Sequence, residues 1–142
     1  MKNILLAGFA VILSLLSNSV QAQNSHEAHA EHVNYVVLTR KVPQLKPIIL
    51  AAEELAAQDG KKFGDFQVVV CGKAVQDLTN KETMNGFIKK AEKAGVIINA
   101  CGFSLKKFGV DRTDLPTALR VVENGILYNF ELQKKGYLSI EL

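Results

Sequence analysis

The stretch that decides the fold is residues 66–71, Phe-Gln-Val-Val-Val-Cys. Its almost continuous apolar character predicts a strand covered on both faces, as strands of parallel sheets are. Residues 96–100, Val-Ile-Ile-Asn-Ala, predict a second strand of this kind. Between the two runs, apolar residues recur at helical spacing: Met84, Phe87, Ile88 and Ala91. This order predicts two parallel strands joined by a crossover helix, and Thr79 and Glu82 have the spacing of a capping box at its start.

The same alternation continues in both directions along the chain. Upstream, residues 33–40 are rich in β-branched side chains and predict a first strand, and the apolar stripe over residues 45–56 predicts a helix that ends at Asp59-Gly60. Downstream, the pattern predicts a short helix at 104–108, a strand at 119–122, a helix at 125–135 and a strand at 137–142. We therefore expect a single α/β domain over residues 33–142. It should have three layers, α/β/α, around a mostly parallel sheet of about five strands, in the doubly wound, flavodoxin-like topology class.

The N-terminus has the three parts of a secretory signal peptide. Lys2 supplies the positive charge, residues 4–16 form an apolar run, and residues 17–22 are polar and end in Val-Gln-Ala. A membrane anchor is the alternative, but the run is shorter than the roughly 20 residues that span a bilayer core. We predict cleavage after Ala22 and a periplasmic or secreted protein that has no membrane association once the signal is removed.

Residues 23–32 are small and polar, lack apolar periodicity, and predict a flexible leader. This leader contains His26, His29 and His32, and neutral imidazole is a common ligand of Zn²⁺ and Cu²⁺. Three-residue spacing turns the three rings around a helix instead of aligning them, and ordering a free segment costs entropy. A solvated tail therefore stands as the alternative to a metal site.

Composition excludes several functional classes. The chain has 17 Lys and Arg against 14 Asp and Glu, spread evenly, and no Trp, which does not favour nucleic-acid binding. Residues 39–43, after the first predicted strand, contain no glycine for a phosphate-binding loop. We predict no cofactor.

Both cysteines follow buried strands. Cys71 ends the second predicted strand, and Cys101 ends the third, just before a short helix. Chemistry in an open parallel sheet collects at these carboxyl ends, and a helix N-terminus favours thiolate, so Cys101 is the candidate nucleophile. Two alternatives remain open: the cysteines pack as small hydrophobic side chains, or they form the disulfide that is common in exported proteins.

Four stretches, at residues 66–72, 95–105, 115–125 and 132–140, resemble the DsrE/DsrF-like superfamily of sulfur relay and intracellular sulfur oxidation. The most specific piece is Ala100-Cys101 followed by Ser104-Leu105. The resemblance implies a doubly wound α/β domain that assembles into homotrimers or homohexamers. It also implies that Cys101 accepts sulfane sulfur as a persulfide and passes it on. Many relatives have histidine where this chain has Cys71, so that a general base is replaced by a possible resolving thiol.

The resulting functional hypothesis is an exported DsrE-like protein in sulfur relay or thiol redox chemistry. Cys101 and Cys71 would be its catalytic residues, and sulfur donor and acceptor proteins would be its partners. The alternative is a non-catalytic oligomer that binds a small ligand or a metal and whose cysteines are structural.

Overall fold

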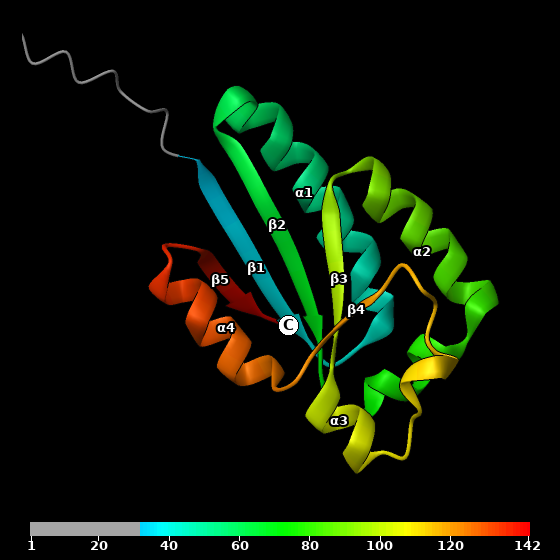
Figure 1. Ribbon diagram of the computed structural model, residues 1–142. Coiled ribbons are helices and arrows are strands. Elements are labelled where there is room, and N and C mark those ends of the chain that lie inside the picture. The colour runs from blue at the N-terminus through cyan, green and yellow to red at the C-terminus, as the bar shows by residue number, and fades with distance from the viewer. Residues whose placement is uncertain (1–31) are drawn as a thin grey trace, which may run out of the picture.

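The computed structural model describes residues 32–142, which form an open twisted sheet with helices on both faces (Figure 1). Its strands are β1 (Val33–Thr39), β2 (Phe63–Val70), β3 (Val96–Cys101), β4 (Arg120–Val122) and β5 (Leu138–Glu141). Its α-helices are α1 (Leu45–Asp59), α2 (Lys81–Lys93), α3 (Gly102–Lys107) and α4 (Gly125–Lys134). The predicted three-layer α/β/α fold with a five-stranded sheet is confirmed.

The sheet is parallel throughout, and its strand order is β4-β3-β2-β1-β5. Successive strands step in one direction from β1 to β4, and the chain then returns through α4 to place β5 on the other side of β1. The sheet is thus doubly wound, as predicted. In the flavodoxin order, 2-1-3-4-5, the second strand occupies that edge, whereas here the last strand does.

The two faces of the sheet are covered unequally. Helices α1 and α2 pack on one face, where they bury the larger core around Phe66, Val68 and Val70. Helix α4, orange in Figure 1, packs on the other face. There Leu132 meets the smaller core that holds both cysteines. Because side chains alternate between faces along a strand, Val69 and Cys71 point toward α4 while Val68 and Val70 point away from it.

The structure corrects one capping prediction and adds several 3-10 helices, of which the longest lies between β2 and α2. The cap of α2 is Asn80, whose side chain accepts a hydrogen bond from the Thr83 N–H at 3.0 Å, and not Thr79. The Thr79 hydroxyl instead donates to the Gln76 carbonyl at 2.8 Å. Residues Gly72–Thr79, which the sequence left unassigned, form a 3-10 helix that buries Val75 and Leu78.

The predicted signal peptide, the cleavage site after Ala22, His26 and His29 all lie outside the described residues. Among residues 32–142, no helix is long and apolar enough to cross a membrane.

Candidate functional site: two thiols beneath a helix N-terminus

The sheet brings the two cysteines of the chain together. Val70 on β2 pairs with Ala100 on β3, so the next residue of each strand, Cys71 and Cys101, lie side by side at the carboxyl edge. Both belong to the core beneath α4, where Cys71 is 6% exposed and Cys101 is 3% exposed. The sequence predicted that both cysteines follow buried strands. The structure places these two strand ends next to each other, and both cysteines are free thiols.

The first residue of α4 lies over both sulfur atoms. The Gly125 N–H donates a hydrogen bond to Cys101 Sγ over 3.3 Å. A Cβ atom at Gly125 would lie 2.5 Å from Cys71 Sγ and 3.2 Å from Cys101 Cβ, distances that leave no room for a side chain. Glycine is therefore required here to let the backbone of α4 approach the thiols, and that approach points the Gly125 N–H and the positive end of the helix dipole at Cys101.

A serine hydroxyl connects the two strand ends. The Gly72 N–H donates to Ser104 Oγ at 2.9 Å, which leaves the Ser104 hydroxyl hydrogen free to donate to another group. Ser104, through its side chain and its backbone, lowers the pKa of the Cys101 thiol. Cys101 is also the N-cap residue of α3, although its side chain makes no capping hydrogen bond there. The Gly125 N–H and Ser104 thus both act on a single sulfur atom.

The environment moves the two thiol pKa values in opposite directions. Burial raises the pKa of Cys101, but hydrogen bonds with Ser104, the Gly125 N–H and Cys71 outweigh it and hold the pKa below its ordinary value. Burial, followed by the charge and hydrogen bond of Cys101, raises the pKa of Cys71 to about 12. When the pair ionises, the negative charge therefore lies on Cys101, while Cys71 keeps its proton.

This division of charge predicts selective alkylation. Only thiolate reacts with iodoacetamide, so we expect the rate at Cys101 to rise with pH along a titration curve whose midpoint lies below the ordinary pKa of a cysteine. Cys71 should stay unlabelled from about pH 6 to pH 9 and react only after unfolding. Peptide mapping of folded and denatured samples measures both rates, and equal labelling of the two cysteines in folded protein would contradict the assignment.

The cap of α4 fixes the approach of Gly125. Asn124 Oδ1 accepts hydrogen bonds from the N–H groups of Ile126, at 3.0 Å, and Leu127, at 3.2 Å. Asn before a helical run is a recognisable cap signal, although the sequence reasoning did not single it out.

We expect Asn124→Ala to destabilise the protein by about 0.5–2 kcal/mol and to raise the pKa of Cys101, because the helix end frays away from the thiol. Asn80→Ala is the matched control, since Asn80 caps α2 in the same way. It should lower stability by a similar amount and leave Cys101 unchanged. Denaturant unfolding and the alkylation profile measure the two effects, and identical profiles for both variants would contradict the coupling.

Other charged groups near the thiols lie at the surface. Arg40, directly after β1, forms an ion pair with Glu141 over 3.1 Å, and both side chains are more than half exposed. Lys106 and Lys107, which the sequence suggested as further support for a Cys101 thiolate, lie in the last turn of α3. Neither is among the groups that lower the pKa of Cys101, because the N-cap and the last turn are opposite ends of that helix.

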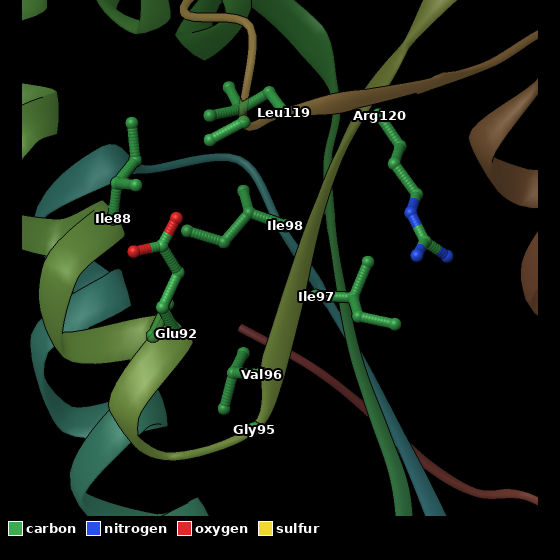
Figure 2. Close-up of a pocket in the computed structure, with 10 residues that line it drawn as sticks. Ile88, Glu92, Gly95, Val96, Ile97, Ile98, Leu119 and Arg120 are labelled. Atoms are coloured by element: carbon green, nitrogen blue, oxygen red, sulfur yellow. The ribbon is translucent and has the colours of Figure 1, made fainter.

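Three cavities lie against the sheet, and neither Cys71 nor Cys101 lines any of them. One of about 230 Å³ lies between α4 and β5 and reaches Leu38 and Arg40, next to the thiols. An apolar groove of about 550 Å³ runs between α1 and the β5 edge. A third, of about 310 Å³, lies between α2 and the start of β3 (Figure 2). There Ile88 and Glu92 extend from α2 toward the sheet, at the end of β3 opposite to Cys101.

A polar network on the same face of the sheet was not foreseen from the sequence. Gln67 and Asn99 interrupt two apolar strands, and Asn99 Nδ2 donates to Gln67 Oε1 at 2.8 Å. Gln67 in turn donates to Asp65 at 2.6 Å, and Tyr128 and Tyr137 donate into the same cluster. The sequence pattern that could have indicated this network is an amide side chain within an otherwise apolar strand, because a buried amide requires hydrogen-bond partners.

Of the three histidines proposed as metal ligands, only His32 is described, and it is exposed at the start of β1. Within residues 32–142, no three His, Cys, Asp or Glu side chains are grouped closely enough to hold a metal ion. The metal site over His26, His29 and His32 stays a prediction.

Comparison with known proteins identifies the fold. No protein-family model matches the chain, and no curated protein matches it. Among solved structures, the chain is similar to a protein of unknown function, MTH1491, from Methanobacterium thermoautotrophicum. The TM-score is 0.67 at 21% identity, and the match covers 78% of this chain and 99% of that one. It is also similar to BT1422, a conserved protein of unknown function from Bacteroides thetaiotaomicron, with a TM-score of 0.59 at 17% identity over 77% of this chain and 94% of that one.

Proposed function

We propose that this protein is an exported member of the DsrE/DsrF-like superfamily whose Cys101 accepts sulfane sulfur as a persulfide. The observation that carries the proposal is the set of donors around one sulfur atom. The Gly125 N–H donates a hydrogen bond to Cys101 Sγ, and Ser104 and Cys71 also lower the pKa of the Cys101 thiol, so that all three favour its thiolate. A thiolate is the form that attacks sulfane sulfur.

The transfer itself is a thiol–persulfide exchange. The Cys101 thiolate attacks the outer sulfur of a donor persulfide, and a new bond forms between that sulfur and Cys101 Sγ. The sulfur–sulfur bond of the donor breaks, and the donor leaves with the electron pair as a thiolate. The Gly125 N–H at the start of α4 then faces an anionic persulfide and stabilises it as it did the thiolate.

The low exposure of Cys101 limits which sulfur donors can reach it. With 3% of the residue accessible, the sulfur must arrive at the end of a narrow arm, such as a small-molecule persulfide or the persulfide of a partner protein's extended cysteine. Incubation of reduced protein with glutathione persulfide, followed by intact-mass measurement, tests the proposal. In the Cys71→Ser variant, which lacks the second thiol, we expect the gain of one sulfur atom per chain, located at Cys101.

We also propose that the protein is a homo-oligomer, a trimer or hexamer as in the superfamily. Supporting this, helix α4 and strand β5 expose large apolar side chains that a monomer would leave in water: Ile126, Leu127, Phe130, Leu138 and Ile140. Exposed apolar patches of this kind commonly mark protein–protein contacts. Sedimentation equilibrium measures the mass directly, and a monomer at every concentration tested would refute the assembly.

The exported location is likewise a proposal. It rests on the signal-like residues 1–22, and N-terminal sequencing of protein isolated from the extracytoplasmic fraction would identify the residue after Ala22 as the mature start.

The competing hypothesis is a non-catalytic binding protein with structural cysteines. The apolar groove of about 550 Å³ between α1 and β5 is the observation that favours it. The two hypotheses differ in their dependence on Cys101, because ligand binding in that groove would survive its replacement while sulfur capture would not.

A further inference from the structure

The second thiol is buried against the first, and their placement bears on what happens after sulfur is captured. Adjacent strands of a sheet lie about 4.8 Å apart, and the paired residues Val70 and Ala100 directly precede the two cysteines. This spacing falls in the range of about 4.4–6.8 Å between Cα atoms that a disulfide requires. Both side chains also point to the same face of the sheet, into the core beneath α4.

The packing around the pair favours a reaction within the chain over one with an outside thiol. Gly125 closes over both sulfurs, because a Cβ atom added to Gly125 would lie 2.5 Å from Cys71 Sγ. The Cys71 backbone is held by a hydrogen bond from its N–H to the Thr39 carbonyl at 2.9 Å. An outside acceptor must open this nearly inaccessible site, whereas Cys71 already occupies it. Such proximity is worth a large effective concentration.

We propose that Cys71 resolves the Cys101 persulfide, so that the sulfane sulfur leaves as sulfide and the two cysteines join in a disulfide. This inference rests on the proposed function and names the first acceptor of the captured sulfur as a residue of the chain itself. The protein is then a persulfide reductase of its donor. Its two thiols supply the two electrons that reduce sulfane sulfur to sulfide.

The step balances in atoms and electrons. The Cys71 thiol passes its proton to the outer sulfur of the adjacent Cys101 persulfide anion, and the Cys71 thiolate then attacks Cys101 Sγ, so that a bond forms between these two atoms. The bond from Cys101 Sγ to the outer sulfur breaks, and the outer sulfur departs with the electron pair. It keeps the proton received from Cys71 and leaves as hydrosulfide. A further turnover requires a dithiol reductant, of the thioredoxin chemical class, to reduce the disulfide.

The test is a single turnover without added reductant. Reduced protein is mixed anaerobically with glutathione persulfide and freed of excess reagent, and released sulfide and intact mass are then measured. For the wild type we expect about one sulfide per chain, the loss of two hydrogens in mass, and a Cys71–Cys101 disulfide in the peptide map. For Cys71→Ser we expect the gain of one sulfur on Cys101 and no sulfide from the protein.

Serine at position 71 keeps a hydroxyl that can donate to the Cys101 thiolate, so the variant separates resolution from thiolate stabilisation. Cys71→Ala, which lacks the donor, should also retain the sulfur, but at a Cys101 of higher pKa. A wild type that keeps its added sulfur and releases no sulfide would overturn the resolving role while leaving the proposed function intact. If neither the wild type nor either Cys71 variant takes up sulfur, both proposals fail.

Discussion

Replacing Cys101 by serine is expected to abolish sulfur capture from a persulfide donor. The Cys71→Ser protein, which keeps Cys101 and lacks the second thiol, should take up one sulfur per chain, and Cys101→Ser should stay at its starting mass. Serine has nearly the shape of cysteine, but its hydroxyl is not ionised at neutral pH and does not form a stable bond to sulfane sulfur. The measurement is intact mass after anaerobic incubation with glutathione persulfide.

Cys71→Ser is the matched control for this variant, because it removes the neighbouring thiol from the same core. It should still capture sulfur, and the two variants should unfold at similar denaturant concentrations. Capture by Cys101→Ser at the level of Cys71→Ser would show that Cys101 is not the acceptor and would contradict the proposed function.

Replacing Gly125 by alanine is expected to have the largest effect on the structure of the site. The added Cβ would meet Cys71 Sγ at 2.5 Å and Val69 Cγ1 at 2.8 Å, so that α4 or the strands must shift. Overpacking of this kind costs about 1–3 kcal/mol. The shift also draws the Gly125 N–H away from Cys101 Sγ, which should raise the pKa of Cys101 and slow its alkylation near neutral pH.

Gly86→Ala is the control for the effect of alanine on a helix. Gly86 lies inside α2, and a Cβ added there meets nothing within 4 Å. This variant should gain about 0.5–1 kcal/mol, since alanine is the better helix former, and should leave Cys101 unchanged. Denaturant unfolding should show a lower free energy of unfolding for Gly125→Ala and a higher one for Gly86→Ala than for the wild type. A Gly125→Ala protein as stable and as reactive as the wild type would contradict the close approach of α4 to the thiols.

The alternation of strands and helices could be predicted from the sequence because each element carries its own signal. The run of residues 66–71 is apolar on both faces, and the Met84–Ala91 stripe has helical period, so local pattern and tertiary burial agree. The 3-10 helix over Gly72–Thr79 has no comparable signal. The cap of α2 could be located only to within one residue, since Thr79 and Asn80 are both good N-cap residues.

The site was predictable only in part, because its members come from distant parts of the chain. The position of each cysteine at a strand end followed from the pattern, but their contact required β2 and β3 to be neighbours. Gly125 reaches Cys101 across 24 residues of sequence, and its role depends on how closely α4 approaches the sheet. Nothing in the local sequence specifies that distance, so neither the closure over both sulfurs nor the raised pKa of Cys71 could be anticipated, whereas the lowered pKa of Cys101 was expected from the short helix that follows it.

If Cys101 receives sulfane sulfur in the folded protein, the sulfur should be found on it in a variant that cannot discharge it. That variant is Cys71→Ser, isolated without reductant, treated anaerobically with glutathione persulfide and analysed by peptide mapping. We expect one added sulfur on the peptide that contains Cys101, removed by dithiothreitol. An unmodified Cys101 that reacts with a thiol label before and after treatment, in a protein that unfolds cooperatively, would contradict the proposed role of Cys101.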